Sequence, residues 1–249
     1  MQITIISDCQ DDNARTRQQS RYQALLGNSV QALFICASTD LQAQGELIDA
    51  IDSRKGQPAI IIVNIAPRGN KKKYPNGIPF CFHQFEKTII IGTPNCFSLA
   101  KKLGMFSTTL QTDVSEVCSK FLSNREAKRI SESQFRSYEY LPYLAKWILE
   151  GQTIPSVEID IEDFGKENFI WGVDCFGNCK TTSTKKWVNL DKYTLLDIDF
   201  FERLADVPKD GVPAFVRGSS GYKSKRFLEV MIQGESASQV LGLRVGSIV

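Results

Sequence analysis

Short runs of β-branched residues recur along the first part of the chain, separated by longer segments in which polar and apolar positions mix. The runs show little alternation, which is typical of strands buried on both faces of a parallel sheet. Two of the intervening segments end in a glycine, Gly27 and Gly56, a residue favoured at the end of a helix. The repeated strand and helix pattern predicts a Rossmann-like α/β layered domain. The four predicted strands are Ile3–Ser7, Ala32–Ala37, Ala59–Ala66 and Thr88–Gly92.

The pattern changes after Gly151. The remaining pieces are short and strand-like, are separated by Gly, Pro, Asn and Lys, and include no long helical pattern. Such a sequence pattern is typical of a small antiparallel barrel or sandwich. We therefore expect the α/β class with two domains: an N-terminal α/β layered domain over residues 1–153 and a smaller C-terminal antiparallel β-barrel domain over residues 154–249.

Composition and charge narrow the class of protein. The 249 residues carry a formal net charge of +2 at pH 7, and 42% of them are hydrophobic. This near-neutral balance gives no reason to expect nucleic acid or an anionic membrane as a partner. No apolar run approaches the roughly 20 residues that span a bilayer, and the N-terminal stretch becomes acidic too early for a signal peptide. The seven cysteines have scattered spacing and are expected as reduced thiols of a cytoplasmic protein.

Asp8 stands at the end of the first predicted strand, before a helix. In open α/β sheets, ligands bind beyond the carboxyl ends of the strands, so this carboxylate is placed to accept hydrogen bonds from a ribose diol. The alternative is that Asp8, together with Asp11 and Asp12, only caps the following helix. No glycine occurs between Ser7 and Arg15, so the turn lacks the phosphate loop of a dinucleotide site.

Two other loops and one cysteine pair are candidates for chemistry. The basic loop 64–77 is either an anion clamp or a solvated surface loop. Asn95, after the fourth predicted strand, either caps a helix or faces a ligand. Cys175 and Cys179 have no second Cys or His pair nearby, which excludes a tetrahedral zinc site, and we expect no metal.

The stretch Phe176-Gly177-Asn178 lies between those two cysteines. A Phe ring can stack on a purine, and an Asn amide can offer a donor and an acceptor to an adenine edge. The same three residues also fit a turn centred on the Asn and packed by the Phe. The stretch alone leaves both interpretations open.

Three segments together resemble a known family. They are Ser7-Asp8, the D-x-F-G-N-x-x-T pattern over residues 174–181, and the closing segment 219–249 with its S-x-G-Y and L-E-V motifs. They resemble the S-adenosyl-L-methionine (SAM) hydroxide adenosyltransferases, the SAM hydrolases related to fluorinase and chlorinase. The resemblance extends over nearly the whole chain.

The resemblance implies a homotrimer that binds SAM between the N-terminal domain of one subunit and the barrel of the next. SAM is then a substrate or ligand, and no cofactor is needed. In the family's hydrolases, water attacks the ribose carbon next to sulfur and releases methionine and adenosine, so the protein's task is to orient the water. Carried over by position, the substrate-binding residues are Asp8 at the ribose, Asn95, Phe176 and Asn178 at adenine, and Ser219, Ser220 and Tyr222 near the methionine end.

The family's catalytic residues are not retained. Its Asp, Arg and His fall near Asn64, Lys71 and Gln134 of this chain. An amide cannot act as a base, and Lys holds an oxyanion with less directionality than Arg. His83 would replace the missing His only if a different strand faced the pocket. The hypotheses are therefore a divergent SAM hydrolase-like enzyme, a catalytically inactive module that binds SAM, adenosine or another nucleoside, and a scaffold without a nucleoside site.

Overall fold

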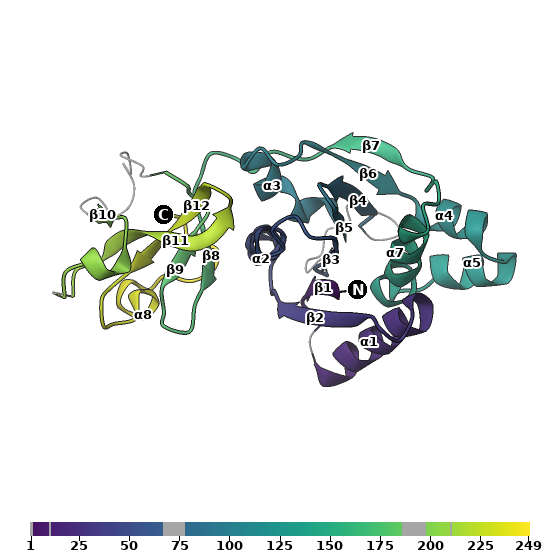
Figure 1. Ribbon diagram of the computed structural model, residues 1–249, viewed down its shortest axis with the longest axis horizontal. Helices are drawn as coiled ribbons and strands as arrows, with labels where there is room; N and C mark the ends of the chain where they lie inside the picture. The colour runs from purple at the N-terminus through teal and green to yellow at the C-terminus, as the bar shows by residue number, and fades with distance from the viewer. Residues whose placement is uncertain (1, 10, 67–77, 186–197, 210) are drawn as a thin grey trace. The chain divides into compact units, whose positions relative to one another are not determined.

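The structure is a computed structural model that describes residues 2–9, 11–66, 78–185, 198–209 and 211–249 (Figure 1). Within these ranges the fold is mixed α/β, with two separate sheets and helices. The chain divides into two compact units, Met1–Asp163 and Phe164–Val249, and each is described by itself. This division falls later than the expected boundary after Thr153, because the strand Val157–Asp160 pairs with a strand of the first unit.

The sheet of the first unit has the strand order β2-β1-β3-β5-β4-β6-β7. Its first four members pair in parallel and are the four strands that the β-branched runs predict. β4 is antiparallel to both β5 and β6, so β6 runs in the same direction as the parallel strands, and β7 runs against it. The strands are β1 (Gln2–Ser7), β2 (Gln31–Cys36), β3 (Ala59–Asn64), β4 (Phe80–Phe85), β5 (Thr88–Gly92), β6 (Thr108–Thr112) and β7 (Val157–Asp160).

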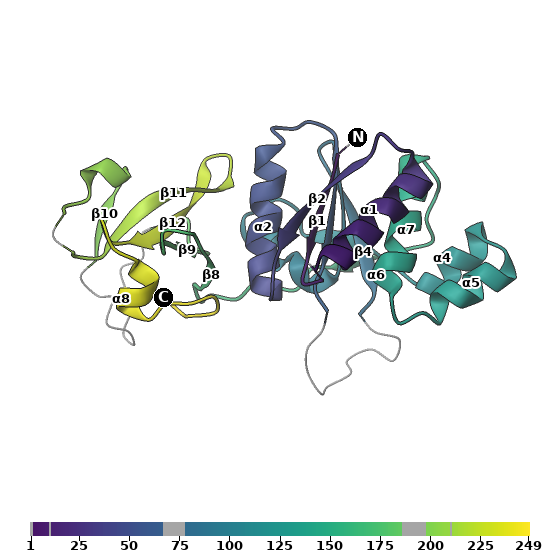
Figure 2. The same ribbon diagram turned by 90° about the horizontal axis from the view of Figure 1, so that it is seen from below.

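Five of these strands, β1, β2, β3, β5 and β6, therefore end at the same edge of the sheet, which we call the carboxyl edge. β4 and β7 begin there. Two layers of helices cover the sheet: α1 and α7 lie on one face, and α2 and α3 lie on the other (Figures 1 and 2). The helices are α1 (Asp12–Leu26), α2 (Asp40–Ser53), α3 (Ser98–Lys102), α4 (Val114–Phe121), α5 (Asn124–Ser131), α6 (Arg136–Glu139) and α7 (Leu141–Leu149), with a 3-10 turn η1 (Pro94–Cys96) before α3.

The main core of the first unit lies between the sheet and α1 with α7. Ile3 and Ile5 of β1 contribute to it, together with Tyr22 of α1 and Leu144 of α7, and all four are almost fully buried. Burial of such side chains stabilises the fold by about 1.5–3 kcal/mol each. The core therefore holds β1 in register and fixes the point at which Asp8 leaves the sheet.

The outer edge of β2 is covered by glutamine side chains. The Gln19 side chain donates to the Val30 carbonyl at 2.9 Å and accepts from the Ala32 amide at 2.7 Å. Gln42 of α2 donates to the Cys36 carbonyl at 3.3 Å. Backbone groups at both ends of this outer strand are thus hydrogen-bonded by side chains.

The second unit contains a five-stranded sheet with the order β10-β11-β12-β9-β8. Its pairs are antiparallel except β10 with β11. β8 and β10 do not pair with each other among the described residues, so the closed barrel expected from the sequence is not shown. The elements are β8 (Ile170–Val173), β9 (Cys179–Thr181), β10 (Asp199–Phe201), the 3-10 turn η2 (Leu204–Asp206), β11 (Ala214–Tyr222), β12 (Lys225–Met231) and α8 (Ala237–Leu241).

Candidate functional site

Asp8 directly follows β1 at the carboxyl edge. Its Oδ1 accepts a hydrogen bond of 3.3 Å from the backbone N–H of Ala66, just beyond β3. Asp11, which the capping alternative named together with Asp8, is the residue that caps α1, because its Oδ1 accepts from the Ala14 amide at 2.9 Å. The chain passes from β1 to β2 on one side and then crosses to β3 on the other, so Asp8 lies at the topological switch point of the parallel strands. Ligands of open α/β sheets bind at this point.

A second carboxylate, Asp40, lies close to Asp8. It is the first residue of α2, and the Thr39 hydroxyl before it accepts from the Gln42 amide as the helix cap. Burial raises the pKa of Asp40, hydrogen bonds from the Asn95 and Cys96 side chains lower it, and the charge of Asp8 raises it. Asp8, Asp40 and Asn95 therefore converge at the carboxyl edge, although they come from three separate parts of the chain.

Sequence reasoning missed Asp40. The signal was present, because Asp40 begins the helix after the second predicted strand, as Asp8 precedes the helix after the first. A carboxylate in the first turn of a helix has an ordinary structural explanation, which concealed its place beside Asp8.

The turn that carries Asn95 is held in place from two sides. The buried Gln44 of α2 accepts from the Ser98 hydroxyl at 2.9 Å and from the Leu99 amide at 2.8 Å. Gly92 lies so close to β3 that an added Cβ would come within 2.5 Å of the Val63 carbonyl oxygen. These contacts fix the path of the chain from β5 into η1, and with it the position of Asn95.

Two carboxylates and one amide at a strand-end site can receive the hydrogen bonds of a vicinal diol and also donate one. In the part of the chain that the structure describes, no three His, Cys, Asp or Glu side chains are grouped as metal ligands.

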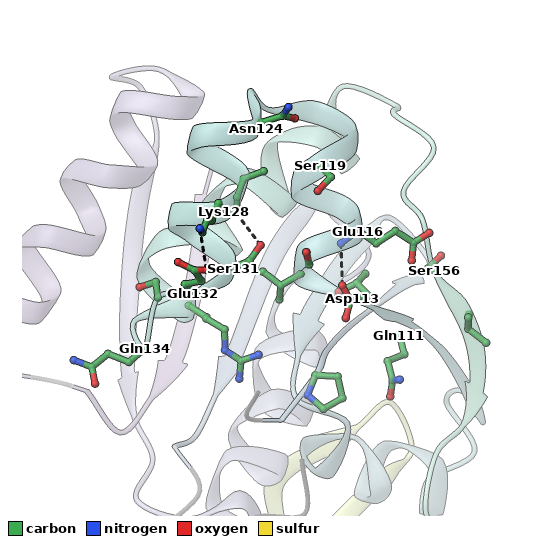
Figure 3. A pocket seen from close by; sticks show the side chains of 18 residues that line it. Gln111, Asp113, Glu116, Ser119, Asn124, Lys128, Ser131, Glu132, Gln134 and Ser156 are labelled. Atoms are coloured by element: carbon green, nitrogen blue, oxygen red, sulfur yellow. Dashed lines mark hydrogen bonds and ion pairs between the residues drawn. The ribbon is translucent and has the colours of Figure 1, made fainter. Parts of the chain in front are cut away.

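The positions that correspond to the family's catalytic residues are separated. Asn64 ends β3 and is in register with Ser7, beside Asp8. Lys71 lies outside the described residues. Gln134 is exposed between α5 and α6, where it lines a groove of about 1040 Å³ bordered by β6, β7 and α4 to α6 (Figure 3). β3 and β6 are three strand spacings apart, about 14 Å.

His83 lies inside β4 and away from the start of that strand at the carboxyl edge. Its ring stacks on Phe106, with 4.2 Å between the centroids. Burial lowers the pKa of this imidazole, although a backbone hydrogen bond at Thr108 and the charge of Glu158 raise it. Its contacts are those of a packed strand residue.

The stretch Phe176-Gly177-Asn178 forms the turn between β8 and β9, and Asp174 organises it. Asp174 Oδ1 accepts from the Phe176 and Asn178 amides at 2.9 Å each, and Oδ2 accepts from Asn178 Nδ2 at 2.9 Å. The turn is therefore centred on the Asp rather than on the Asn. The Phe176 side chain does not pack it, because the residue is 76% exposed.

Ser219, Ser220 and Tyr222 lie at the far end of β11 from that turn. β12 pairs antiparallel with both β11 and β9, so the end of β11 meets Lys225 at the start of β12, whereas the turn lies near Met231 at its end. About four to six residues of strand separate the three residues from the turn, about 13–20 Å. Ser220 is buried and Ser219 is exposed. Within the second unit, the expected adenine and methionine contacts are thus far apart.

Comparisons with known proteins give the fold and nothing further. No family model and no curated protein matches the chain. A solved structure described as an uncharacterized conserved protein from Thermotoga maritima matches with a TM-score of 0.66 and 14% identity, covering 99% of this chain and 100% of that chain. A conserved hypothetical protein from Thermus thermophilus matches with a TM-score of 0.64 and 17% identity, covering 99% of each chain. The likeness extends over both units.

No helix in the described part of the chain combines the length and the apolar character needed to cross a membrane.

Proposed function

We propose that the chain binds a ribonucleoside, adenosine or SAM, at the carboxyl edge of the first unit. The observation that carries the proposal is the convergence of Asp8, Asp40 and Asn95 at the switch point of the parallel strands. Asp8 and Asp40 accept hydrogen bonds from the two ribose hydroxyls. The resemblance of the sequence to the SAM hydroxide adenosyltransferases supports the same ligand.

The proposed activity is binding without cleavage of SAM. Asn64 stands beside Asp8, where the family resemblance calls for an Asp, and an amide cannot take a proton from water. Gln134 lines a separate groove. Binding without turnover therefore fits the residues better than a divergent SAM hydrolase, which is the alternative that the assay below tests.

Phe176 and Asn178 are proposed to contact adenine. The Phe176 ring is exposed and can stack on a base. Asn178 Nδ2 already donates to Asp174, so the amide contributes its carbonyl oxygen as an acceptor for the exocyclic amine of adenine. By the family resemblance, these residues belong to a neighbouring copy in a homotrimer, which sedimentation equilibrium can test.

Calorimetric titration with adenosine, 2′-deoxyadenosine and SAM tests the binding. Loss of a hydrogen bond to a charged group costs about 1.5–3 kcal/mol, so 2′-deoxyadenosine is expected to bind at least about tenfold more weakly than adenosine. Asp8→Asn is expected to reduce adenosine binding to the same degree. Asp12→Asn removes an equal charge in the first turn of α1 and serves as the matched control with unchanged affinity.

Equal binding of adenosine and 2′-deoxyadenosine, or unchanged affinity in Asp8→Asn, contradicts the ribose assignment. Chromatography of the SAM mixture addresses the chemistry separately. Methionine and adenosine appearing together would replace binding alone with hydrolysis.

A further inference from the structure

The groove at the ends of β6 and β7 is a second candidate site in the first unit. It has a volume of about 1040 Å³, near the upper end of the range of small-molecule sites, and α4, α5 and α6 form its other walls (Figure 3). Its lining is rich in hydroxyl, amide and charged groups and, among the described residues, contains no aromatic side chain. A ligand recognised here is therefore polar and is not held by stacking.

Arg136 is the half-buried cation of this groove. Its Nη2 donates to the Ile78 carbonyl at 3.0 Å, and its guanidinium lies over the Phe80 ring, 5.4 Å from the centroid. Burial lowers its pKa, and the charge of Asp113 raises it. No carboxylate forms an ion pair with Arg136 among the described residues. A guanidinium has five N–H donors in a planar fork that matches a carboxylate, so most of its donors remain for a ligand.

Two carboxylates that line the groove, Asp113 and Glu116, form no ion pair with a cation in the described part of the chain. Lys128 and Glu132 form an ion pair of 3.9 Å and offset each other. Asp113 Oδ1 accepts from the Glu116 amide at 2.9 Å, which uses one oxygen but leaves the charge. Asp113 and Glu116 thus line the groove as anions (Figure 3), and the charge of Asp113 acts on Arg136.

We propose that this groove binds the zwitterion of an α-amino acid, with the carboxylate on the Arg136 fork and the ammonium group against Asp113. A phosphate dianion would meet two carboxylates for one arginine and is disfavoured. The zwitterion belongs either to a free amino acid or to the amino-acid end of a SAM molecule bound in this groove rather than at Asp8. The proposal uses none of the residues of the nucleoside site, so the two proposals can be tested separately.

The full-length protein is titrated with each standard L-α-amino acid in turn, with SAM, and with adenosine. Binding of at least one amino acid, or of SAM, is expected. For an amino acid that binds, its amide and its N-acetyl derivative each lack one of the two charges. Each derivative is expected to bind at least about tenfold more weakly, which is about 1.4 kcal/mol or more.

Arg136→Gln is expected to weaken the same binding at least about tenfold, because a charge-assisted bidentate contact is lost. Arg125→Gln, on α5 but outside the groove lining, is the matched control and is expected to bind normally. Since Arg136 also packs on Phe80, Asp113→Asn serves as a second variant, which removes the charge of an exposed side chain and keeps an oxygen for the Glu116 amide. It is expected to weaken binding of the amino acid but not of its N-acetyl derivative.

The source of the zwitterion is identified by which ligands bind and which of them bind more weakly to Arg136→Gln. If Arg136→Gln weakens SAM but no free amino acid binds, the groove takes the amino-acid end of SAM. Adenosine binding is expected to be unaffected by Arg136→Gln, so failure at this groove is distinguishable from failure of the nucleoside site. The proposal is overturned if neither SAM nor any amino acid binds in an Arg136-dependent manner. It is also overturned if the amide binds as well as the parent amino acid, or if inorganic phosphate competes equally well.

Discussion

Replacement of Gly177 by Ala tests whether the turn between β8 and β9 is fixed against the start of α8. Gly177 has φ +85°, and an added Cβ would overlap the Ser236 hydroxyl and lie 2.9 Å from the Ser236 Cα. A left-handed conformation costs an L-residue about 1–2 kcal/mol, and overpacking adds about 1–3 kcal/mol. We therefore expect Gly177→Ala to lower the free energy of unfolding by about 2–5 kcal/mol, the sum of the two costs.

Gly165 provides the matched control. It has nearly the same conformation, φ +87°, but nothing lies within 4 Å of its added Cβ. Gly165→Ala is thus expected to cost only the conformational part, about 1–2 kcal/mol. Urea denaturation followed by circular dichroism gives both values, and Ser236→Gly introduced together with Gly177→Ala should recover part of the difference. Equal destabilisation by the two alanines would refute the proposed contact with Ser236.

Three further substitutions, one of them with a control, have defined outcomes. Phe176→Ala should change the free energy of unfolding by less than about 0.5 kcal/mol, because the side chain is 76% exposed, yet weaken adenosine binding by about 1–3 kcal/mol in calorimetry. The pKa of Asp40 is raised in the folded state, so folding stability should fall as pH rises from the ordinary Asp pKa of 3.8 through the higher folded pKa. Asp40→Asn should flatten this part of a stability profile measured by urea denaturation, and an unchanged slope would contradict the assignment. The pKa of Glu139 is lowered, chiefly by its hydrogen bond with Arg129, so Glu139 stabilises the fold above the ordinary Glu pKa of 4.5 and loses this effect as pH falls through the folded pKa. Glu139→Gln should therefore destabilise the protein at about pH 7 more than at about pH 3, whereas Glu132→Gln, at an exposed pair, should change stability by less than about 0.5 kcal/mol at either pH.

The parallel half of the first sheet could be predicted from the sequence because its strands are buried on both faces and read as continuous apolar runs. Ile60, Ile61 and Ile62, for example, are all buried in β3. β6 has the sequence TTLQT and carries no such signal. Its place in the sheet depends on pairing with β4 and β7, which are distant in the chain, and local pattern does not encode that pairing. The same limit explains why β7 lies beyond the boundary expected from the sequence.

The candidate site was predictable where a residue type coincided with the end of a recognisable strand, as at Asp8. Asp40 was hidden because a carboxylate that begins a helix is common without any ligand. Its proximity to Asn95 arises only when α2 and η1 pack together through Gln44. The role of Asp174 was missed in a similar way, because the interpretation of the turn considered only Phe176 and Asn178. The candidate role of Arg136 could not be predicted, because it depends on the fold placing this cation where no described carboxylate forms an ion pair with it.

The glutamine side chains along β2 restrict how copies of this chain can assemble. A strand from another molecule could join the sheet at that side only by first displacing the amides of Gln19 and Gln42 from the backbone groups they occupy. An outer strand with free backbone groups is the usual starting point for uncontrolled sheet growth. Continuation of the sheet along the whole of β2 is therefore disfavoured, and we expect the subunits of the proposed homotrimer to meet through other surfaces.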